Sequence, residues 1–472
     1  MDRYFARHDG QAVTTDDFVQ AMQDASDVDL THFKRWYNQA GTPVVTVTPS
    51  YDAAKQVMTL RIAQMTPPTP DQPEKLPLHI PFSIGFVSQQ GGDIALQEPG
   101  DERAPVTTRT LSVTQAEQSF VFAKVPPNAV PSLNRGFSAP VIVRYPYTIA
   151  ELTHLMAHDT EGFNRWEAAQ ELSLRLLLEG VASQQAGRPV AFPDAYLEAL
   201  ARVLAQGAQD PAFAAATLTL PAEGLIAERM EIADPDAIHL VRRQVRTRIA
   251  SALRVQLEST YAAMRVDGPY SPAAAPAGRR ALRNVCLGLL MEIADAPLRA
   301  VCLRQFDEAD NMTDMLAAMT AFANCECPER NIVLDRFYTR WHAESLVIDK
   351  WLVAQSTSRL PSALTEVRRL LTHASFDLRN PNKVRSLIGG FCQSNPVHFH
   401  AADGSGYAFA ADQICALDPI NPQIAARLAR GFDRWRKFDS CRQSHARAAL
   451  ESIRALVTLS KDTSEVIDKA LR

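Results

Sequence analysis

The chain has 472 residues, of which 46% are hydrophobic, and its 49 basic and 53 acidic residues give a formal net charge of −4. This length supports roughly two to four domains, and the even charge balance, without a basic stripe, argues against nucleic-acid binding. No apolar run approaches the ~18 to 20 residues of a membrane span. The seven cysteines mostly stand singly in apolar helical patterns, and the first residues lack the apolar core of a signal peptide, so we expect a cytoplasmic protein.

The first forty residues predict two short helices. Thr14 is a candidate N-cap, with Asp17 three residues later as in a capping box. Apolar residues follow at helical spacing: Phe18, Val19 and Met22. A second helix is expected from Asp29, with three aromatic residues on one face: Phe33, Trp36 and Tyr37. Two short helices cannot bury this aromatic surface against each other, so we expect them to have a packing partner elsewhere.

The composition then changes to that of a β domain. In "LHIPFSIGF" (78–86) apolar and polar or small residues alternate, which predicts a strand with one buried face. Pro81 cannot donate to a strand ladder, so it indicates an edge position or a bulge. Other candidate strands are 44–48, 57–64, 119–122 and 140–145. Short strands separated by turn signals over about a hundred residues predict a small antiparallel β-sandwich.

From about Thr148 the hydrophobic period becomes helical. Apolar stripes recur in "ALRNVCLGLL" (281–290), in "NMTDMLAAMTAF" (311–322), where Asn311 is a candidate N-cap, and in "LTEVRRLL" (364–371). Each helix has a single apolar stripe and a short polar joint, which predicts stacked helical hairpins, although no exact repeat period is present. The predicted fold is therefore mixed and mainly α: a β-sandwich followed by a large all-α domain.

His154 and His158 have the i, i+4 spacing of the histidines in an H-E-x-x-H zinc protease. That motif needs a glutamate base directly after the first histidine, where this chain has Leu155. Its gluzincin form also needs a glutamate nineteen residues after the second histidine, and that position is Leu177. Without a base or a third ligand these histidines cannot support metal-assisted hydrolysis, and we expect them to be structural.

Three further patterns are candidate chemical sites. His398, His400 and Asp403 can be drawn as a metal site, but "DGSG" (403–406) is equally typical of a turn whose aspartate binds local amides. As a phosphate-binding loop, "DGSG" lacks a preceding strand and a lysine. Cys325 and Cys327 resemble half of a thiolate site without the second half. The residues therefore predict no metal site and no active site in this chain.

Several long segments of the chain resemble one family. They are "YFARHDGQAVTTDDFVQAM", "DLTHFKRWYNQAGTP", "TPPTPDQPEKLPLHIPFSIGF", "DNMTDMLAA", "WLVAQS", "NPNKVRSLIGGF" and "NPVHFHAADGSGY". Together they resemble bacterial aminopeptidase N, a family of zinc-dependent alanyl aminopeptidases of the gluzincin type. The resemblance is in order, spans the whole chain and corresponds to the C-terminal half of a full-length member.

The resemblance implies a domain organisation and a partner. Residues 1–41 would be the last helices of a thermolysin-like catalytic domain that is otherwise missing, which would explain their unpartnered aromatic face. Residues 42–147 would be the β-sandwich, and 148–472 the helical domain that caps the catalytic site and encloses a chamber. The implied partners are the N-terminal catalytic half and, in the full-length protein, peptides; the implied cofactor of the full-length family is zinc.

Few functional residues of the family have a counterpart in this chain. The family's G-x-M-E-N segment, its H-E-x-x-H motif with the distal glutamate, and its catalytic tyrosine lie upstream and have no counterpart here. By resemblance, Arg385 and Arg427 match basic positions that could face the chamber and meet the carboxylate end of a bound peptide. A solvated or salt-bridged arginine is an equally good reading of each. His400 matches the family's F-H pair, whereas His398 does not belong to the pattern.

Two functions follow from these observations. In the first, the chain is the non-catalytic part of an aminopeptidase N, inactive alone and contributing to peptidase function only with the missing half. In the second, it is a stand-alone β-sandwich and helical-repeat module that binds other proteins. The coding sequence directly upstream would distinguish the two, since the first requires an open frame with the catalytic motifs.

Overall fold

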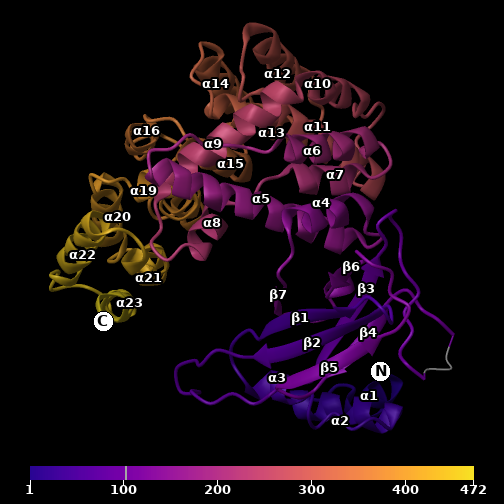
Figure 1. Ribbon diagram of the computed structural model, residues 1–472. Helices are drawn as coiled ribbons and strands as arrows, with labels where there is room; N and C mark the ends of the chain where they lie inside the picture. The colour runs from indigo at the N-terminus through magenta and orange to yellow at the C-terminus, as the bar shows by residue number, and fades with distance from the viewer. Residues whose placement is uncertain (101–103) are drawn as a thin grey trace. The chain divides into compact units, whose positions relative to one another are not determined.

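The computed structural model describes residues 1–100 and 104–472, which form two compact units, Met1–Leu172 and Ser173–Arg472. The first unit contains the N-terminal helices and the β-sandwich, and the second is helical (Figure 1). Across the described part of the chain, no helix combines the length and the apolar character needed to span a membrane.

The N-terminal segment forms three helices: α1 (Asp2–His8), α2 (Thr15–Ser26) and α3 (Arg35–Asn38). The predicted capping box at the start of α2 is present, because the Asp17 amide donates to Thr14 Oγ1 and the Thr14 amide donates to Asp17 Oδ2. α1 has no buried residue, and α2 buries only Val19 and Ala21. This segment therefore contributes little to the core of the first unit.

The second predicted helix, from Asp29, is wrong in extent. Only Arg35–Asn38 is helical, because its side chains bind the backbone of the sandwich. Trp36 Nε1 donates to the carbonyl of His79 at 2.8 Å, and Arg35 donates to the carbonyl of Pro77 at 2.6 Å. Gln39 makes two hydrogen bonds with the backbone of Leu76. These tertiary contacts replace the continuing helix that the aromatic spacing predicted.

The sandwich consists of two sheets. The first has the strand order β5-β2-β1-β7 and the second β4-β3-β6. The strands are β1 (Val44–Asp52), β2 (Val57–Met65), β3 (Ile80–Val87), β4 (Arg109–Val113), β5 (Glu117–Phe122), β6 (Val130–Leu133) and β7 (Ile142–Arg144). Neighbouring strands are antiparallel except β1 and β7, which are parallel. The antiparallel sandwich predicted from the strand spacing is confirmed, and β4 and β6 are strands that the prediction missed.

Strand β3 is buried on both faces, although its alternation predicted one. Phe82, Ile84 and Phe86 are completely buried in the core between the sheets. On the opposite face the guanidinium of Arg135 covers Gly85, where an added Cβ would lie 2.2 Å from Arg135 Cζ. Pro81 pairs only with β4, because the pairing with β6 starts at Ile84, so its missing N–H leaves no gap in the ladder.

The buried Arg135 lies in the 3-10 turn η1 (Arg135–Phe137) and holds several segments together. It binds both carboxylate oxygens of Asp93, at 2.9 and 2.8 Å, and lies 3.2 Å from Asp159 at the end of α4 (Ile149–His158). Asn164, in the first part of α5 (Gly162–Gln185), donates to the carbonyl of Leu133 at 2.7 Å. These bonds explain why the first compact unit continues through α4 to Leu172.

The second unit contains helices throughout (Figure 1). After α5 they are α6 (Asp194–Gln206), α7 (Pro211–Leu218), α8 (Glu223–Arg229), α9 (Pro235–Ala252), α10 (Arg254–Ala263), α11 (Ala274–Leu290), α12 (Ala296–Glu308), α13 (Met312–Ala323), α14 (Glu329–Trp341), α15 (Ser345–Ser356), α16 (Ala363–Leu370), α17 (Pro381–Val384), α18 (Gly390–Ser394), α19 (Pro396–Phe399), α20 (Ser405–Leu417), α21 (Pro422–Ala429), α22 (Ser440–Arg454) and α23 (Lys461–Leu471). Short turns η2 (Arg385–Gly389), η3 (Arg430–Phe432) and η4 (Trp435–Lys437) join some of them. The predicted N-cap of α13 is confirmed, since Asn311 Oδ1 accepts from the Asp314 amide at 2.9 Å.

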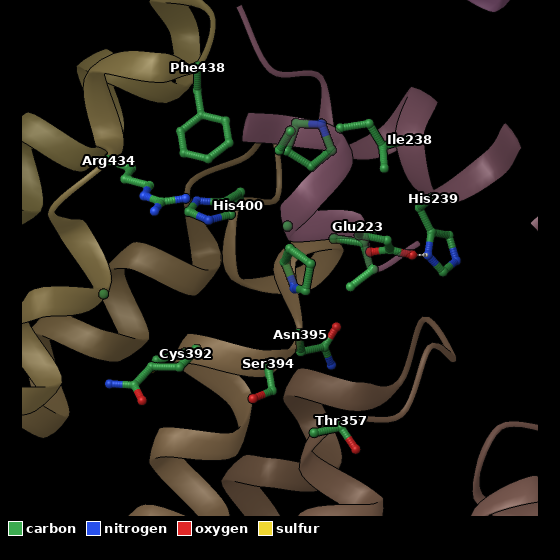
Figure 2. Close-up of a pocket in the computed structure, with 18 of the residues that line it drawn as sticks. Glu223, Ile238, His239, Thr357, Cys392, Ser394, Asn395, His400, Arg434 and Phe438 are labelled. Atoms are coloured by element: carbon green, nitrogen blue, oxygen red, sulfur yellow. Dashed lines mark hydrogen bonds and ion pairs between the residues drawn. The ribbon is translucent and has the colours of Figure 1, made fainter. Parts of the chain in front are cut away.

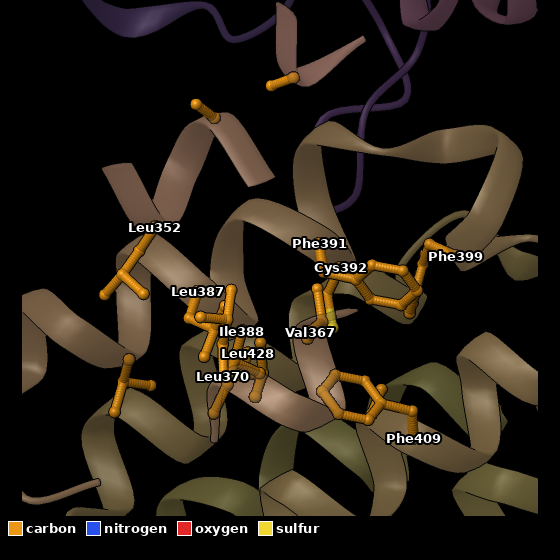
Figure 3. Close-up of a cluster of buried hydrophobic side chains, with 14 of the residues drawn as sticks. Leu352, Val367, Leu370, Leu387, Ile388, Phe391, Cys392, Phe399, Phe409 and Leu428 are labelled. Atoms are coloured by element: carbon orange, nitrogen blue, oxygen red, sulfur yellow. The ribbon is translucent and has the colours of Figure 1, made fainter. Parts of the chain in front are cut away.

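The core of the second unit is built from the apolar stripes of successive helices (Figure 3). Leu352 of α15, Val367 of α16, Leu387 of η2 and Phe409 of α20 lie in one buried cluster. η2 is a π-helical turn continuous with α17 and α18. Gly390 follows it, where an added Cβ would lie 2.3 Å from Ser356 Oγ, and that hydroxyl donates to the carbonyl of Ser386. The π turn is thus fixed tightly against the end of α15.

A clasp joins the region of α8 and α9 to residues about two hundred positions later. Ala233 and Phe438 form a parallel β-bridge, and Lys437 Nζ donates to the carbonyl of Glu228 at 2.7 Å. Arg442 forms an ion pair with Asp236. This clasp closes one wall of the cavity described below.

Candidate functional site

His154 and His158 lie one turn apart on α4, with ring centroids 4.8 Å apart. His154 Nε2 is 2.8 Å from the carbonyl oxygen of Ser88, so this nitrogen is already bonded. The His158 ring packs against Gly91. Among residues 1–100 and 104–472, no three His, Cys, Asp or Glu side chains are grouped so that they could hold a metal ion. The described residues therefore form no group that fits the zinc ion that the family resemblance implies.

His400 is a buried member of an aromatic cluster. Its Nδ1 is 2.9 Å from the Tyr407 hydroxyl, and its ring stacks on Phe438 at 4.0 Å. Burial lowers the pKa of His400 to about 3, so the ring is neutral. Asp403 Oδ1 accepts from the Ser405 amide at 2.9 Å, as expected for the local turn. Burial also lowers the pKa of His398.

Cys325 and Cys327 lie near a third cysteine, Cys302. Burial, together with a hydrogen bond that the Cys327 thiol donates to Cys325, raises the pKa of Cys327 to about 12. Cys302 of α12 lies close enough that both thiols add to the burial that raises its own pKa. Since the thiolate is the form that attacks and binds metals, the raised pKa makes Cys302 and Cys327 poor nucleophiles and poor metal ligands at neutral pH.

Arg385, one of the two predicted chamber residues, lines a cavity of about 690 Å³. It lies at the start of the π turn, on the exposed side. Lys350 and Asp349 also line the cavity, and the Asp349 carboxylate is paired with the buried Lys383, whose Nζ lies 2.7 Å from Oδ1. Its wall is part apolar, with Leu346 and Val353 exposed to it.

Arg427, the other predicted residue, lies on the exposed face of α21. Its carbonyl accepts from Gln393, but its guanidinium makes no hydrogen bond or ion pair with the residues that the structure describes. It does not line the cavity that contains Arg385. The structure therefore does not bring the two arginines into one cavity, and their roles stay predictions.

A second cavity, of about 710 Å³, lies between the start of α8, the first turns of α9 and the segment from α18 to η4 (Figure 2). Glu223 and His239 form a pair across its edge, with Oε1 and Nδ1 2.9 Å apart. Thr357, at the end of α15, lines this cavity and also the cavity that contains Arg385. The two cavities are therefore neighbours.

Arg242 and Arg359 line the second cavity and belong to a cluster with an excess of positive charge. Glu292, buried nearby, binds Arg246 at 2.6 Å and Arg359 at 3.0 Å. Burial opposes the ionisation of Glu292, but the two arginines hold its pKa below the ordinary value. Burial first, and then the like charges of Arg246 and Arg359, lower the pKa of Arg242.

These arginines were not predicted from the sequence. The available signal is the run "LVRRQVRTR" (240–248), in which Arg242 and Arg246 stand at i, i+4 on one face of α9. Such a run is usually a solvated helix face, so the pattern alone does not identify a cavity. Arg359 follows α15 without any motif.

Comparison with known proteins gives the class of each part. Residues 41–146 match a family described as "Domain of unknown function (DUF3458) Ig-like fold". Residues 149–472 match the family described as "Domain of unknown function (DUF3458_C) ARM repeats". The protein class is thus an Ig-like sandwich followed by armadillo-type helical repeats, and the chain belongs to the DUF3458_C family.

The chain is similar over its whole length to one part of longer proteins. The chain is 45% identical over 472 residues to aminopeptidase N of Escherichia coli and 40% identical over 471 residues to aminopeptidase N of Caulobacter vibrioides. It spans about half the length of these relatives, 54% and 53%. The crystal structure of Legionella pneumophila aminopeptidase A in complex with aspartic acid is 28% identical, with a TM-score of 0.85 over 99% of this chain and 53% of that one. The chain is homologous to the C-terminal part of aminopeptidase N, a metallopeptidase, as the motif resemblance predicted.

Proposed function

We propose that this chain is the non-catalytic part of an aminopeptidase N and acts by capping an active site that the N-terminal half carries. The identity of 45% along the whole chain, against 54% of the relative's length, is the observation that supports it most. The chain alone should be inactive, since its described residues do not fit a zinc ion. Zinc and the catalytic groups would come from the other half.

The domain division proposed for this role is 1–41, 42–147 and 148–472. The limits of the two matched families, 41–146 and 149–472, support it. The α4 segment packs with the sandwich, so the first residues of the helical domain would also form its joint with the sandwich. The seven free thiols support a reducing compartment, and we place the protein in the cytoplasm.

Arg385 and Arg427 are proposed to face the chamber. The position of Arg385 in a cavity beside Lys350 supports a contact with a bound peptide. Arg427 has support only from the matching sequence position.

Complementation tests the proposal. The purified chain should release no p-nitroaniline from alanyl-p-nitroanilide with added zinc, whereas co-expression with the N-terminal half of the Escherichia coli relative should restore turnover that a chelator abolishes. The N-terminal half alone is the matched control. Chelator-sensitive turnover by the repurified chain would contradict the proposal, and so would an N-terminal half that is fully active alone.

A further inference from the structure

Arg242 and Arg359 both line the 710 Å³ cavity, and each has one guanidinium nitrogen without a hydrogen-bond partner in the described part of the chain. Arg242 donates from Nε to the Pro221 carbonyl at 2.8 Å and from Nη2 to the Leu220 carbonyl at 3.4 Å. Arg359 donates from Nε to Asn324 at 3.3 Å and from Nη2 to Glu292 at 3.0 Å. Neither Nη1 has a hydrogen-bond partner within the described ranges.

The charges around these arginines do not balance. Glu292 is shared between Arg246 and Arg359, so one carboxylate serves two guanidinium groups. Arg242 forms no ion pair with any described residue, and the nearby Glu223 is bound to His239. A half-buried cluster with unpaired positive charge is stabilised by an anion, and guanidinium groups match the two oxygens of a carboxylate.

Asn395 adds a hydrogen-bond acceptor to the same wall. The residue is 3% exposed, and Nδ2 donates to the carbonyls of Ser356 and Ser358, both at 2.9 Å. These two bonds fix the amide orientation, because only the NH₂ group can donate. Figure 2 shows its nitrogen on the side of Thr357 and its oxygen turned away, and this oxygen accepts no hydrogen bond in the described part of the chain.

The rest of the wall is largely apolar. Ile238, Pro396, Val397 and Phe438 line the cavity beside the polar groups. A ligand that fits this wall has a carboxylate for the arginines, an N–H for Asn395 and an apolar side chain. The last residue of a peptide carries all three on one backbone unit.

We infer that this cavity binds the C-terminal residue of a peptide, with Arg242 and Arg359 on its carboxylate and Asn395 on its amide N–H. The choice of a peptide rests on the proposed peptidase function, while the carboxylate site rests on the cavity alone. Since Thr357 lines both cavities, the preceding residues of the peptide would extend toward Arg385. This assigns the carboxylate to a different pair of arginines from the pair predicted by resemblance.

Ligand-observed NMR titration of the full chain tests the inference without any catalysis. The probes are N-acetyl-Ala-Ala-Leu as the free acid and the same peptide as its C-terminal amide. We expect the free acid to bind at least about tenfold more tightly, which is the scale of a charge-assisted hydrogen bond. Equal binding of the two probes, or no binding of the free acid, would refute the site even if complementation by the N-terminal half succeeds.

Variants locate the site. Arg242→Gln and Arg359→Gln should each weaken the binding of the free-acid peptide by about tenfold and leave the binding of the amide peptide unchanged. Arg243→Gln, an exposed neighbour on the same helix, is the matched control and should have no effect. A loss with Arg385→Gln but not with Arg242→Gln would place the carboxylate in the other cavity and overturn the inference. Competition by inorganic phosphate that is stronger than that by acetate would also overturn it, because the ligand would then be a phosphate.

Discussion

Replacing Gly85 with alanine tests how firmly the buried Arg135 is held. The new Cβ would lie 2.2 Å from Cζ, 2.4 Å from Nη1 and 2.6 Å from Nε of Arg135. The guanidinium cannot move aside freely, because it is bound to both oxygens of Asp93, to Thr108 and to Ser132. Accommodating one methyl group therefore requires that the arginine leave its ion pairs or that strand β3 shift.

The expected loss of stability follows from the ion pair that moving Arg135 would break. The side chain of Arg135 is 3% exposed and that of Asp93 12%, so the pair is buried. Burial raises the pKa of Asp159, so Arg135 also compensates a carboxylate that is costly to bury. Separating a buried charge from its partner costs ~3 to 5 kcal/mol, and overpacking alone costs ~1 to 3 kcal/mol. We expect Gly85→Ala to lower the free energy of unfolding of the first unit by roughly 3 to 5 kcal/mol.

Hydrogen exchange of the β3 amides is the appropriate measurement, because a chain with two units does not unfold in one step. Gly162→Ala is the matched control, since its added Cβ would meet nothing within 4 Å. In the Arg135→Ala variant the space beside Gly85 is free. Gly85→Ala should therefore lower the free energy of unfolding much less in that background than in the unmodified chain. A change below about 1 kcal/mol in the single variant would show that Arg135 is not rigidly held, and the reasoning would fail.

Three further outcomes are expected. His400 is neutral when folded at pH 5 but charged when unfolded, so the unfolded chain binds more protons from about pH 3 to 6.5, and stability is lost as the pH falls through this range. Hydrogen exchange of the α20 amides, corrected for the pH dependence of the intrinsic rates, should show that the opening free energy around His400 is lower at pH 5 than at pH 7 by about 2 kcal/mol, and His400→Asn should remove most of this difference. Hydrogen exchange should be fast in 2–26, intermediate in 35–40, which is bonded to the sandwich, and slow in 282–290; equal protection of 2–26 and 282–290 would contradict this. Elemental analysis of protein purified without a histidine tag should find no stoichiometric zinc, and one zinc per chain that is lost in His398→Ala/His400→Ala would disprove the structural role of these histidines.

Local signals predicted the parts of the fold that local chemistry determines. The capping box at Thr14 and the N-cap at Asn311 are set within four residues, and the strand at 78–86 by its own alternation. The helix expected from Asp29 failed because its partners lie about forty residues later, in the backbone of Pro77 and His79. The burial of Gly85 could not be predicted from the local sequence either, since it depends on an arginine fifty residues away.

The cavity lined by Arg242 and Arg359 could not be predicted from the sequence for a similar reason. Arg242 is one arginine in a run of four, and only the fold shows that it lies in a cavity while Arg243 faces solvent. Asn395 begins the segment "NPVHFHAADGSGY", but the orientation of its amide depends on the carbonyls of Ser356 and Ser358. A cavity is defined by the elements that meet around it, and the outermost of these are separated here by more than two hundred residues.

The clasp between Glu228–Asp236 and Lys437–Arg442 also determines when the second unit can finish folding. Its two sides are 206 residues apart at Asp236 and Arg442. At ~5 to 20 residues per second, a ribosome needs about 10 to 40 s to make the intervening chain. During this time α8 and the start of α9 expose the surface that Phe438 will cover, and closing so long a loop delays folding further. A nascent chain arrested before η4 should therefore be a substrate for chaperones, with the cavity still open on one side.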